Sequence, residues 1–175
     1  MYRLTNPLIW LCRIRHRCGY GVHSPFAFRF IKEVIYETAP YYAYMELDMS
    51  LPYKDRFRVR RILHLLMRIS NKRQPKIITC LSSSEHARHY LAAGCRKARI
   101  IDYVPDEVID LCWIDEPEDK ILTHLDEHSI LILNNLDKYK GWFKNLPSVV
   151  SFDLYDIGIA FFDTKYNKQH YIVNF

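Results

Sequence analysis

Four apolar segments in the second half of the chain run into polar side chains that could bind a ligand. Ser82–Ser84 follow the first segment, Asp102 lies near the end of the second, Asp115 follows the third and Asn134–Asn135 follow the fourth. Oxygen ligands suit hard divalent cations, so Asp115 and the asparagines are candidates for a magnesium site. The alternative is that Asp115 caps the helix after it while the asparagines make turn hydrogen bonds.

Two other groupings could carry chemistry. Ser84 with His86 and His89 could pair a nucleophile with a base, although a serine at a helix start is usually a cap and no Gly-x-Ser-x-Gly elbow is present. Soft metal ligands lie near the N-terminus at Cys12, His16, Cys18 and His23. Their spacing does not match the common zinc-finger patterns. Helix capping and apolar packing explain these residues without a metal.

The charge is unevenly distributed. Residues 1–75 carry 14 Lys/Arg and 5 Asp/Glu, a net charge of +9, whereas residues 76–175 have a net charge of −4. Basic side chains gather with tyrosines at Arg13, Arg15 and Arg17 and at Arg56, Arg58, Arg60 and Arg61. This pattern permits nucleic-acid binding, because arginine contacts phosphate and tyrosine stacks on bases. The alternative is an amphipathic helix whose charged heads remain in water.

The N-terminal part is predicted to be helical. Ser24 followed by Pro25 is a strong helix start, because serine caps free N–H groups and proline suits the first position. Apolar residues then repeat at helical spacing until Pro40 stops the helix. A second helix is expected over Asp55–Ile69. Tyr41–Leu47 between them is expected to be an irregular, aromatic linker.

After Pro75 the pattern changes to short apolar runs that alternate with helical stretches. Buried strands are expected at Lys76–Leu81, Ala98–Tyr103, Val108–Ile114 and Ser129–Leu133, and antiparallel strands at Val149–Leu154, Gly158–Phe162 and His170–Phe175. Helices are expected at Ser82–Ala93, with a Ser82/Glu85 capping box and a Gly94 stop, at Pro117–Leu125, and at Asp137–Leu146, where Asp137 is the cap. The pattern predicts an α/β fold with a mostly parallel sheet.

One connection in this scheme is unusually short. Tyr103–Val108 is too short for an ordinary parallel crossover, which takes roughly a dozen residues or more. Either a helix and a strand are missing here, or Ala98–Tyr103 pairs differently. If a strand is missing, Ala98–Tyr103 becomes an edge strand. We then expect the N-terminal helices and Tyr41–Met45 to pack on the sheet, with any dimer formed through these aromatic surfaces.

Length and composition indicate one folded domain. The chain has 175 residues and 49% hydrophobic residues, and we expect residues 1–75 to pack as a helical extension on a core formed by residues 76–175. The five cysteines are odd in number and scattered, so no disulfide framework is implied. The apolar run Pro7–Cys12 is far shorter than a membrane span of about 20 residues. We therefore expect a cytoplasmic protein without membrane contact.

Segments near the two ends of the chain resemble a known family. The segment Gly21–Phe26 (GVHSPF) is similar to the entry segment of class I S-adenosylmethionine (SAM) dependent methyltransferases found in Bacteroidetes, and Val150–Phe162 with Gln169–Phe175 resemble their last strands. The resemblance implies a reduced Rossmann-like methyltransferase sheet preceded by two N-terminal helices. It also implies that the family's third strand has been lost after Asp102.

The resemblance implies a cofactor site at Ser82, Ser84, Asp102 and Asp115. Asp102 matches the acid that holds the ribose, but Thr79 and Cys80 stand where the family has an acidic residue, and serines replace its glycines. Each serine adds a Cβ where close approach or a positive φ is needed. The first hypothesis is therefore a degenerate methyltransferase with no cofactor, which binds a protein partner or a small molecule. The alternatives are an active SAM-dependent methyltransferase and a nucleic-acid-binding module.

Overall fold

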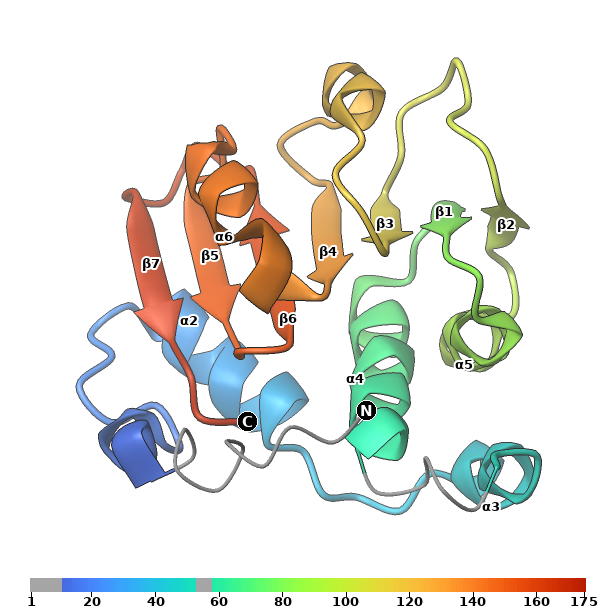
Figure 1. Cartoon of the computed structure of the whole chain (residues 1–175), viewed down its shortest axis with the longest axis horizontal. Helices are drawn as coiled ribbons and strands as arrows, with labels where there is room; N and C mark the ends of the chain where they lie inside the picture. The colour runs from blue at the N-terminus through green and yellow to red at the C-terminus, as the bar shows by residue number, and fades with distance from the viewer. Residues whose placement is uncertain (1–10, 53–57) are drawn as a thin grey trace.

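The computed structural model describes residues 11–52 and 58–175 and contains one seven-stranded sheet in the order β2-β1-β3-β4-β6-β5-β7 (Figure 1). The strands are β1 Ile77–Leu81, β2 Arg99–Ile101, β3 Leu111–Ile114, β4 Ile130–Asn134, β5 Val150–Asp153, β6 Ile157–Phe161 and β7 Gln169–Ile172. Strands β2, β1, β3 and β4 are parallel to one another, and β6 is antiparallel to both β4 and β5. The predicted Rossmann-like sheet is confirmed.

The last strand, β7, differs from the expected antiparallel arrangement. It pairs with β5 in parallel, with Val150 opposite Gln169. Because β6 runs against β5, it ends beside the start of β5, and residues 162–168 need only reach the far side of that strand. A strand that starts there runs parallel to β5. Within the sheet, only β6 opposes the other strands.

The short connection after β2 crosses a single neighbouring strand. Strand β2 forms one edge of the sheet and pairs only with β1, so residues 102–110 pass over β1 to begin β3 on its other side. An extended chain can cover that path without a helix, since each residue spans about 3.3 Å. Asp110 fixes the end of the link, where its Oδ2 accepts hydrogen bonds from the N–H groups of Lys76 and Ile77 at 2.8 and 2.9 Å. The expected edge strand is therefore present.

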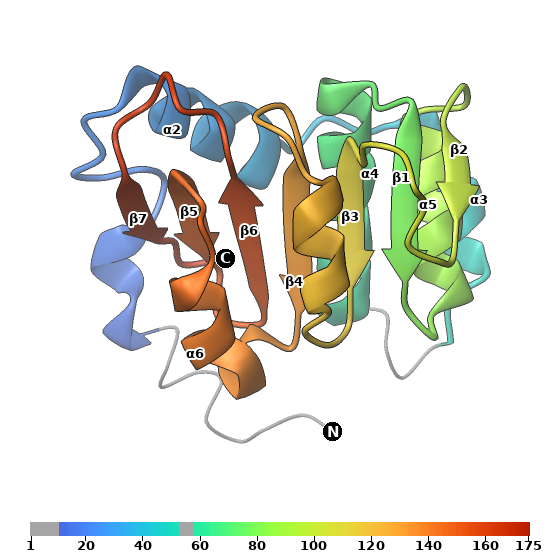
Figure 2. The same cartoon turned by 90° about the horizontal axis from the view of Figure 1, so that it is seen from above.

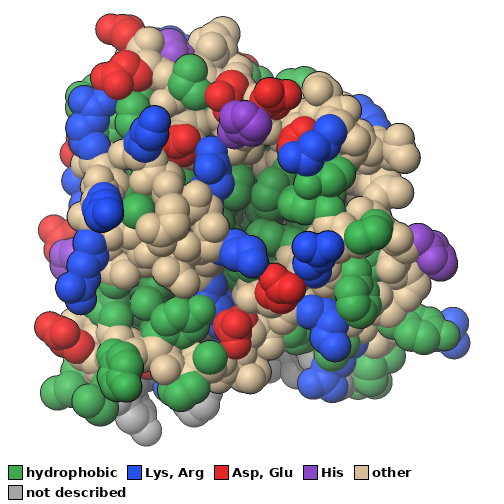
Figure 3. All heavy atoms as spheres, turned by 180° about the vertical axis from the view of Figure 1, so that it is seen from behind, with side chains coloured by type: hydrophobic (Ala, Val, Ile, Leu, Met, Phe, Trp, Pro, Cys, Tyr) green, Lys and Arg blue, Asp and Glu red, His purple; other side chains and the backbone are tan. Residues whose placement is uncertain are grey.

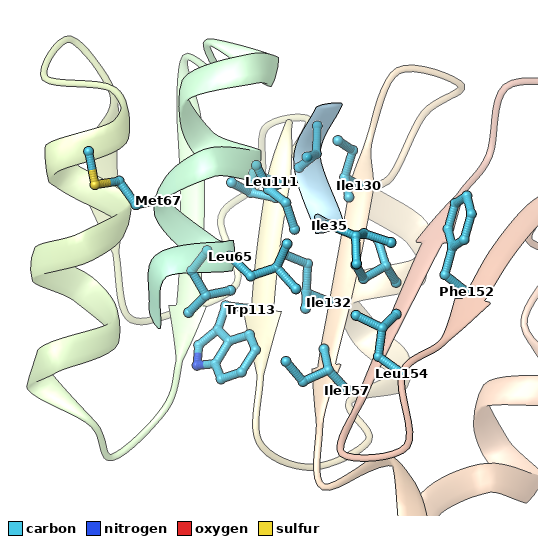
Figure 4. Close-up of a cluster of buried hydrophobic side chains, with 14 of the residues drawn as sticks. Ile35, Leu65, Met67, Leu111, Trp113, Ile130, Ile132, Phe152, Leu154 and Ile157 are labelled. Atoms are coloured by element: carbon cyan, nitrogen blue, oxygen red, sulfur yellow. The ribbon is translucent and has the colours of Figure 1, made fainter. Parts of the chain in front are cut away.

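Helices cover both faces of the sheet. One face carries α2 (Pro25–Phe30), the π-helix Ile31–Ile35, α4 (Arg58–Arg73) and α5 (Glu85–Gly94), and the other carries the 3-10 helix Asp119–His124 and α6 (Leu136–Asn145). Figure 2 shows α6 and this 3-10 helix in front of the strands, with α4 and α5 behind. On the α4 side, Leu65 lies over Leu111, Trp113 and Ile132 of the strands (Figure 4). The continuous apolar runs of the sequence are thus buried on both faces.

The entry helix begins as predicted. Ser24 is the N-cap residue, its Oγ accepts a hydrogen bond from the Ala27 N–H at 3.3 Å, and Pro25 occupies the first turn. The helix continues as a π-helix that closes with a bond from the Tyr36 N–H to the Ile31 carbonyl at 2.9 Å. A short 3-10 helix, Ile14–His16, precedes it. Phe30 packs on Phe152 and Phe161 of the sheet, with ring centroids 5.1 and 4.9 Å away.

The expected irregular linker is a helix. Helix α3 spans Tyr42–Met49, and it packs Tyr44 and Leu47 against the core while Tyr42 and Met45 stay exposed. Good helix formers such as alanine, methionine, glutamate and leucine stabilise this segment despite its tyrosines. It contacts α4 and α5, with Tyr44 stacked on His64 at 3.6 Å, and therefore packs on the helical layer instead of on the sheet.

Helices α4 and α5 are in close contact. A Cβ on Gly94 would lie 2.4 Å from the Met67 carbonyl oxygen of α4, and the Ser70 hydroxyl donates to the Leu91 carbonyl at 2.8 Å. Gly94 was expected only as a helix stop, but close packing requires it. Helix α4 runs beyond the predicted end at Ile69, to Arg73, and the predicted start at Asp55 lies outside the described residues.

Candidate functional site

The polar residues singled out in the sequence lie where parallel strands end. Ser82 follows β1, Asp115 follows β3, and Asn134 is the last residue of β4, so all three belong to the carboxyl edge of the sheet. Ligands of open α/β sheets bind at this edge. Strands β1, β3 and β4 are neighbours in the sheet, which brings these side chains together.

Asp115 is the centre of this group. Its Oδ2 accepts hydrogen bonds from the Ser82 hydroxyl at 2.7 Å and from the Ser83 N–H at 3.2 Å. Its Oδ1 accepts one from the Asn134 amide at 2.9 Å, and its backbone carbonyl accepts a longer one from Asn135 at 3.4 Å. Both carboxylate oxygens therefore already accept hydrogen bonds from the protein itself, two at Oδ2 and one at Oδ1.

The serine turn is held by the same network. Ser82 Oγ donates to Asp115 and also accepts from the Ser84 N–H at 3.1 Å, so one hydroxyl bridges the strand end and the helix start. Ser84 is the N-cap residue of α5 by backbone geometry, with no side-chain cap hydrogen bond. The predicted Ser82/Glu85 capping box is wrong, because the Ser82 hydroxyl is engaged by Asp115. None of these serines has a positive φ, so the turn forms without glycine.

Two expected helix caps are also replaced. Asp115 does not cap the following helix, whose cap is Glu118, accepting a hydrogen bond from the Lys120 N–H at 3.2 Å. That helix is a 3-10 helix, tighter than the predicted one. Helix α6 starts one residue before Asp137, and its N-cap residue, Asn135, has a left-handed conformation with a φ of 53°. This turn aims the Asn135 amide at the Asp115 carbonyl.

Asp102 lies apart from this network. It follows β2 at the sheet edge and forms an ion pair with Arg88 of α5 at 3.3 Å, with its side chain 69% exposed. Thr79 and Cys80, which stand at the family's acidic position, are buried within β1. Burial raises the pKa of the Cys80 thiol to about 11, so it remains protonated at neutral pH. The structure thus brings Ser82, Ser84 and Asp115 together but leaves Asp102 separate.

The fold of this chain is similar to that of a solved enzyme. Podospora anserina methyltransferase PaMTH1, in a crystal structure with S-adenosylhomocysteine (SAH) bound, is similar over 79% of this chain and 96% of that chain, with a TM-score of 0.51 and 13% identity. This chain has a methyltransferase-like fold. No protein-family model and no curated protein matches the sequence. At this identity the likeness shows the fold alone.

Four polar side-chain atoms are buried without a hydrogen-bond partner among the described residues. They are Arg68 Nε in α4, Thr79 Oγ1 in β1, His86 Nδ1 in the first turn of α5 and Trp113 Nε1 in β3. Trp113 lies two residues before Asp115, and its side chain belongs to the α4 face of the sheet. An unpaired buried polar group costs about 1–3 kcal/mol.

Sequence reasoning missed a second polar cluster, which joins three helices. His64 Nε2 of α4 lies 2.8 Å from Asp48 Oδ1 of α3, and the Tyr90 hydroxyl of α5 donates to the same oxygen at 2.5 Å. Burial lowers the pKa of His64, with Asp48 opposing the shift, and burial raises the pKa of Tyr90. No residue of Tyr42–Met49 is fully buried and its apolar residues show little helical periodicity, so no sequence signal pointed to this helix and its aspartate.

The remaining candidate groups are dispersed. Arg13 pairs with Asp153 at 2.9 Å, Arg61 lies over the Phe175 ring at 4.6 Å, and Arg56 lies outside the described residues. Within residues 11–52 and 58–175, no three His, Cys, Asp or Glu side chains form a group that could hold a metal ion. No helix in that part of the chain is long and apolar enough to span a membrane. Nucleic-acid binding stays a prediction.

Proposed function

We propose that this chain is a methyltransferase-like domain that has lost SAM binding and catalysis and now acts as a binding or scaffold protein. The observation that carries the proposal is the Asp115 network. A cofactor needs free donors and acceptors at the carboxyl edge, but Ser82, Ser83 and Asn134 already donate to both oxygens of the Asp115 carboxylate at that edge. Hydrogen bonds to a charged group contribute about 1.5–3 kcal/mol each, and a ligand would have to replace them.

Two further features support the loss of the cofactor. The acid that should hold the ribose, Asp102, is paired with Arg88. The serine turn places Cβ atoms and a bridging hydroxyl where the family uses glycines to let the cofactor approach the backbone. In this proposal the domain is single, because α2, the π-helix and α4 of residues 1–75 share one apolar core with the strands. It acts in the cytoplasm, in keeping with its free cysteines.

The second candidate function is an active SAM-dependent methyltransferase, and one observation favours it. Thr79, His86 and Trp113 keep buried polar atoms unpaired on the elements that form the carboxyl edge. A cofactor bound there could satisfy them. Residues of this chain would then supply orientation and hydrogen bonds, while SAM would supply the methyl group.

Calorimetric titration of the full chain with SAM and with SAH separates the two candidates. We expect no binding heat up to about 1 mM of either compound. Any dissociation constant would then lie far above the micromolar values of a working cofactor site. Micromolar binding of either one would overturn the proposed loss. If binding appears, Asp115→Ala should alter it only when the ligand occupies this edge, which locates the site.

A further inference from the structure

A hollow of about 490 Å³ opens at the end of the sheet opposite Asp115. Strand β4 connects the two places, because Asn134, its last residue, donates to Asp115 while Ile130, its first residue, lines the hollow. Helices α2 and α4 form its sides. Figure 3 shows a recess with a hydrophobic floor and blue Lys and Arg side chains around it.

The walls of the hollow are largely aromatic. They comprise Phe26 and Phe30 of α2, Phe161 of β6, Tyr166, Ile69 and Ile130. Phe26 stacks on Tyr166 with ring centroids 4.4 Å apart and meets Phe161 edge to face at 5.2 Å. These contacts fix the rings, so the hollow is formed before any ligand arrives. Pockets for small molecules typically measure about 300–1,000 Å³ and are lined in this way.

The rim carries Arg29, Lys72 and Arg73 beside the carboxylate of Glu33, and one of these cations makes no close ion pair with a described residue. Lys72 pairs with Glu33 at 2.9 Å, and Arg73 pairs with Asp110 at 3.2 Å and donates to the His128 carbonyl at 3.0 Å. Arg29 also lines the hollow and is exposed, and it makes no hydrogen bond or close ion pair with another described residue, although its charge acts on Glu33, which also lines the hollow. An apolar wall beside an unpaired guanidinium complements a ligand with an apolar body and one anionic group.

We propose that this hollow binds a small amphiphilic carboxylic acid. Its aromatic or aliphatic body would lie against Phe26, Phe161 and Tyr166, and its carboxylate would receive the two parallel N–H donors of Arg29. Lys72 lies on the same side, where it is paired with Glu33. The site is independent of the Asp115 edge and does not depend on whether SAM binds there.

The test uses 2-naphthoate as the probe, titrated by calorimetry into the full chain, with neutral 2-naphthylmethanol for comparison. We expect saturable naphthoate binding below about 1 mM, and binding about tenfold weaker for the alcohol, because charge-assisted bonds to arginine are lost. Arg29→Gln should weaken naphthoate binding about tenfold and leave the alcohol unchanged. Arg96→Gln, which removes an exposed arginine far away beside β2, is the matched control and should have no effect.

Three results would overturn the proposal: no saturable binding, equal binding of the acid and the alcohol, or unchanged naphthoate affinity in Arg29→Gln. Tyr166→Ala provides a second measurement on the apolar wall and should weaken both probes. Circular dichroism of each variant shows whether it is folded. Failure here leaves the SAM titration unaffected, because the two sites lie at opposite ends of β4.

Discussion

Polar side chains are paired differently at the two ends of strand β4. At the carboxyl end, Asp115 is closed by donors from two neighbouring strand ends and the serine turn. At the other end, Arg29 lies unpaired beside aromatic rings. In the function proposed above, the fold keeps the location of a cofactor site while its own side chains satisfy that site, and it leaves a binding group free elsewhere. Free groups, more than fold ancestry, show where a ligand would gain contacts.

The largest expected effect comes from a substitution that disturbs helix α4, which packs near both regions. Helix α4 packs on α5 at Gly94 and also lines the hollow through Ile69. Gly94→Ala puts a Cβ 2.4 Å from the Met67 carbonyl oxygen, and backbone atoms there cannot easily move. We expect the free energy of unfolding to fall by about 3 kcal/mol in urea denaturation.

Gly141→Ala is the matched control for this variant. Gly141 lies in α6, and an added Cβ meets nothing within 4 Å. Alanine is the better helix former, so this change should raise stability by about 0.5–1 kcal/mol. Equal stabilities for the two variants would contradict the close α4–α5 contact.

The next prediction addresses the closed end alone. Asp115→Ala removes the acceptor of the Ser82 hydroxyl and the Asn134 amide, which become partly buried donors without partners. Stability should fall by about 2 kcal/mol. Asp102→Ala removes a carboxylate that is 69% exposed, and exposed ion pairs contribute little, so its effect should stay within about 0.5 kcal/mol. Similar losses for both variants would mean that the carboxyl edge is not closed by Asp115.

Local rules in the sequence predicted most of the sheet and part of the site. The apolar runs before Ser82, Asp115 and Asn134 became neighbouring parallel strands, and the carboxyl-edge rule then brought these side chains together. The hydrogen-bond partner of each side chain could not be predicted from the sequence. Ser82 has the spacing of a capping box, and only the tertiary position of Asp115 shows why its hydroxyl bonds elsewhere.

Other features depend on contacts that no local pattern encodes. The parallel pairing of β7 follows from the path of the chain around β5, and the packing role of Gly94 depends on α4, which is distant in sequence. The hollow was missed because α2, α4, β4 and β6 each contribute to its lining. Arg29 therefore looked like an ordinary solvated helix residue.

The third prediction concerns pH and the His64 cluster, which joins α3, α4 and α5. Burial lowers the pKa of His64 below its usual 6.5, so the folded chain disfavours the protonated ring. Its stabilising contribution is full above pH 6.5 and is lost as the pH falls from there through the folded pKa, because the unfolded chain takes up the proton first. Burial also lowers the pKa of His170, so that residue acts in the same direction.

Urea denaturation between pH 7.5 and 5 measures this slope. His64→Phe keeps an aromatic ring over Tyr44 but cannot titrate, so its stability should depend less on pH than that of the unaltered chain. His170→Asn should remove a separate share of the slope. Superimposable profiles for His64→Phe and the unaltered chain would contradict the assignment.

The smallest expected effect concerns an exposed stripe on α3. Tyr42, Met45 and Met49 lie on one side of that helix at i, i+3 and i+7, with exposures of 101%, 79% and 77%. We propose that a second copy of the chain covers this stripe. Because one short helix offers much less than the roughly 800 Å² per partner of a standard interface, the dimer should be weak and should form only at high concentration.

Light scattering should show a mass that rises with concentration, and Met45→Lys with Met49→Lys should hold the chain as a monomer without lowering its stability. Tyr20→Ser, which removes an aromatic residue that is 84% exposed on another element, is the control and should leave the mass unchanged. A mass independent of concentration would contradict the dimer. It would not affect the conclusions about the Asp115 network or the hollow at the other end of β4.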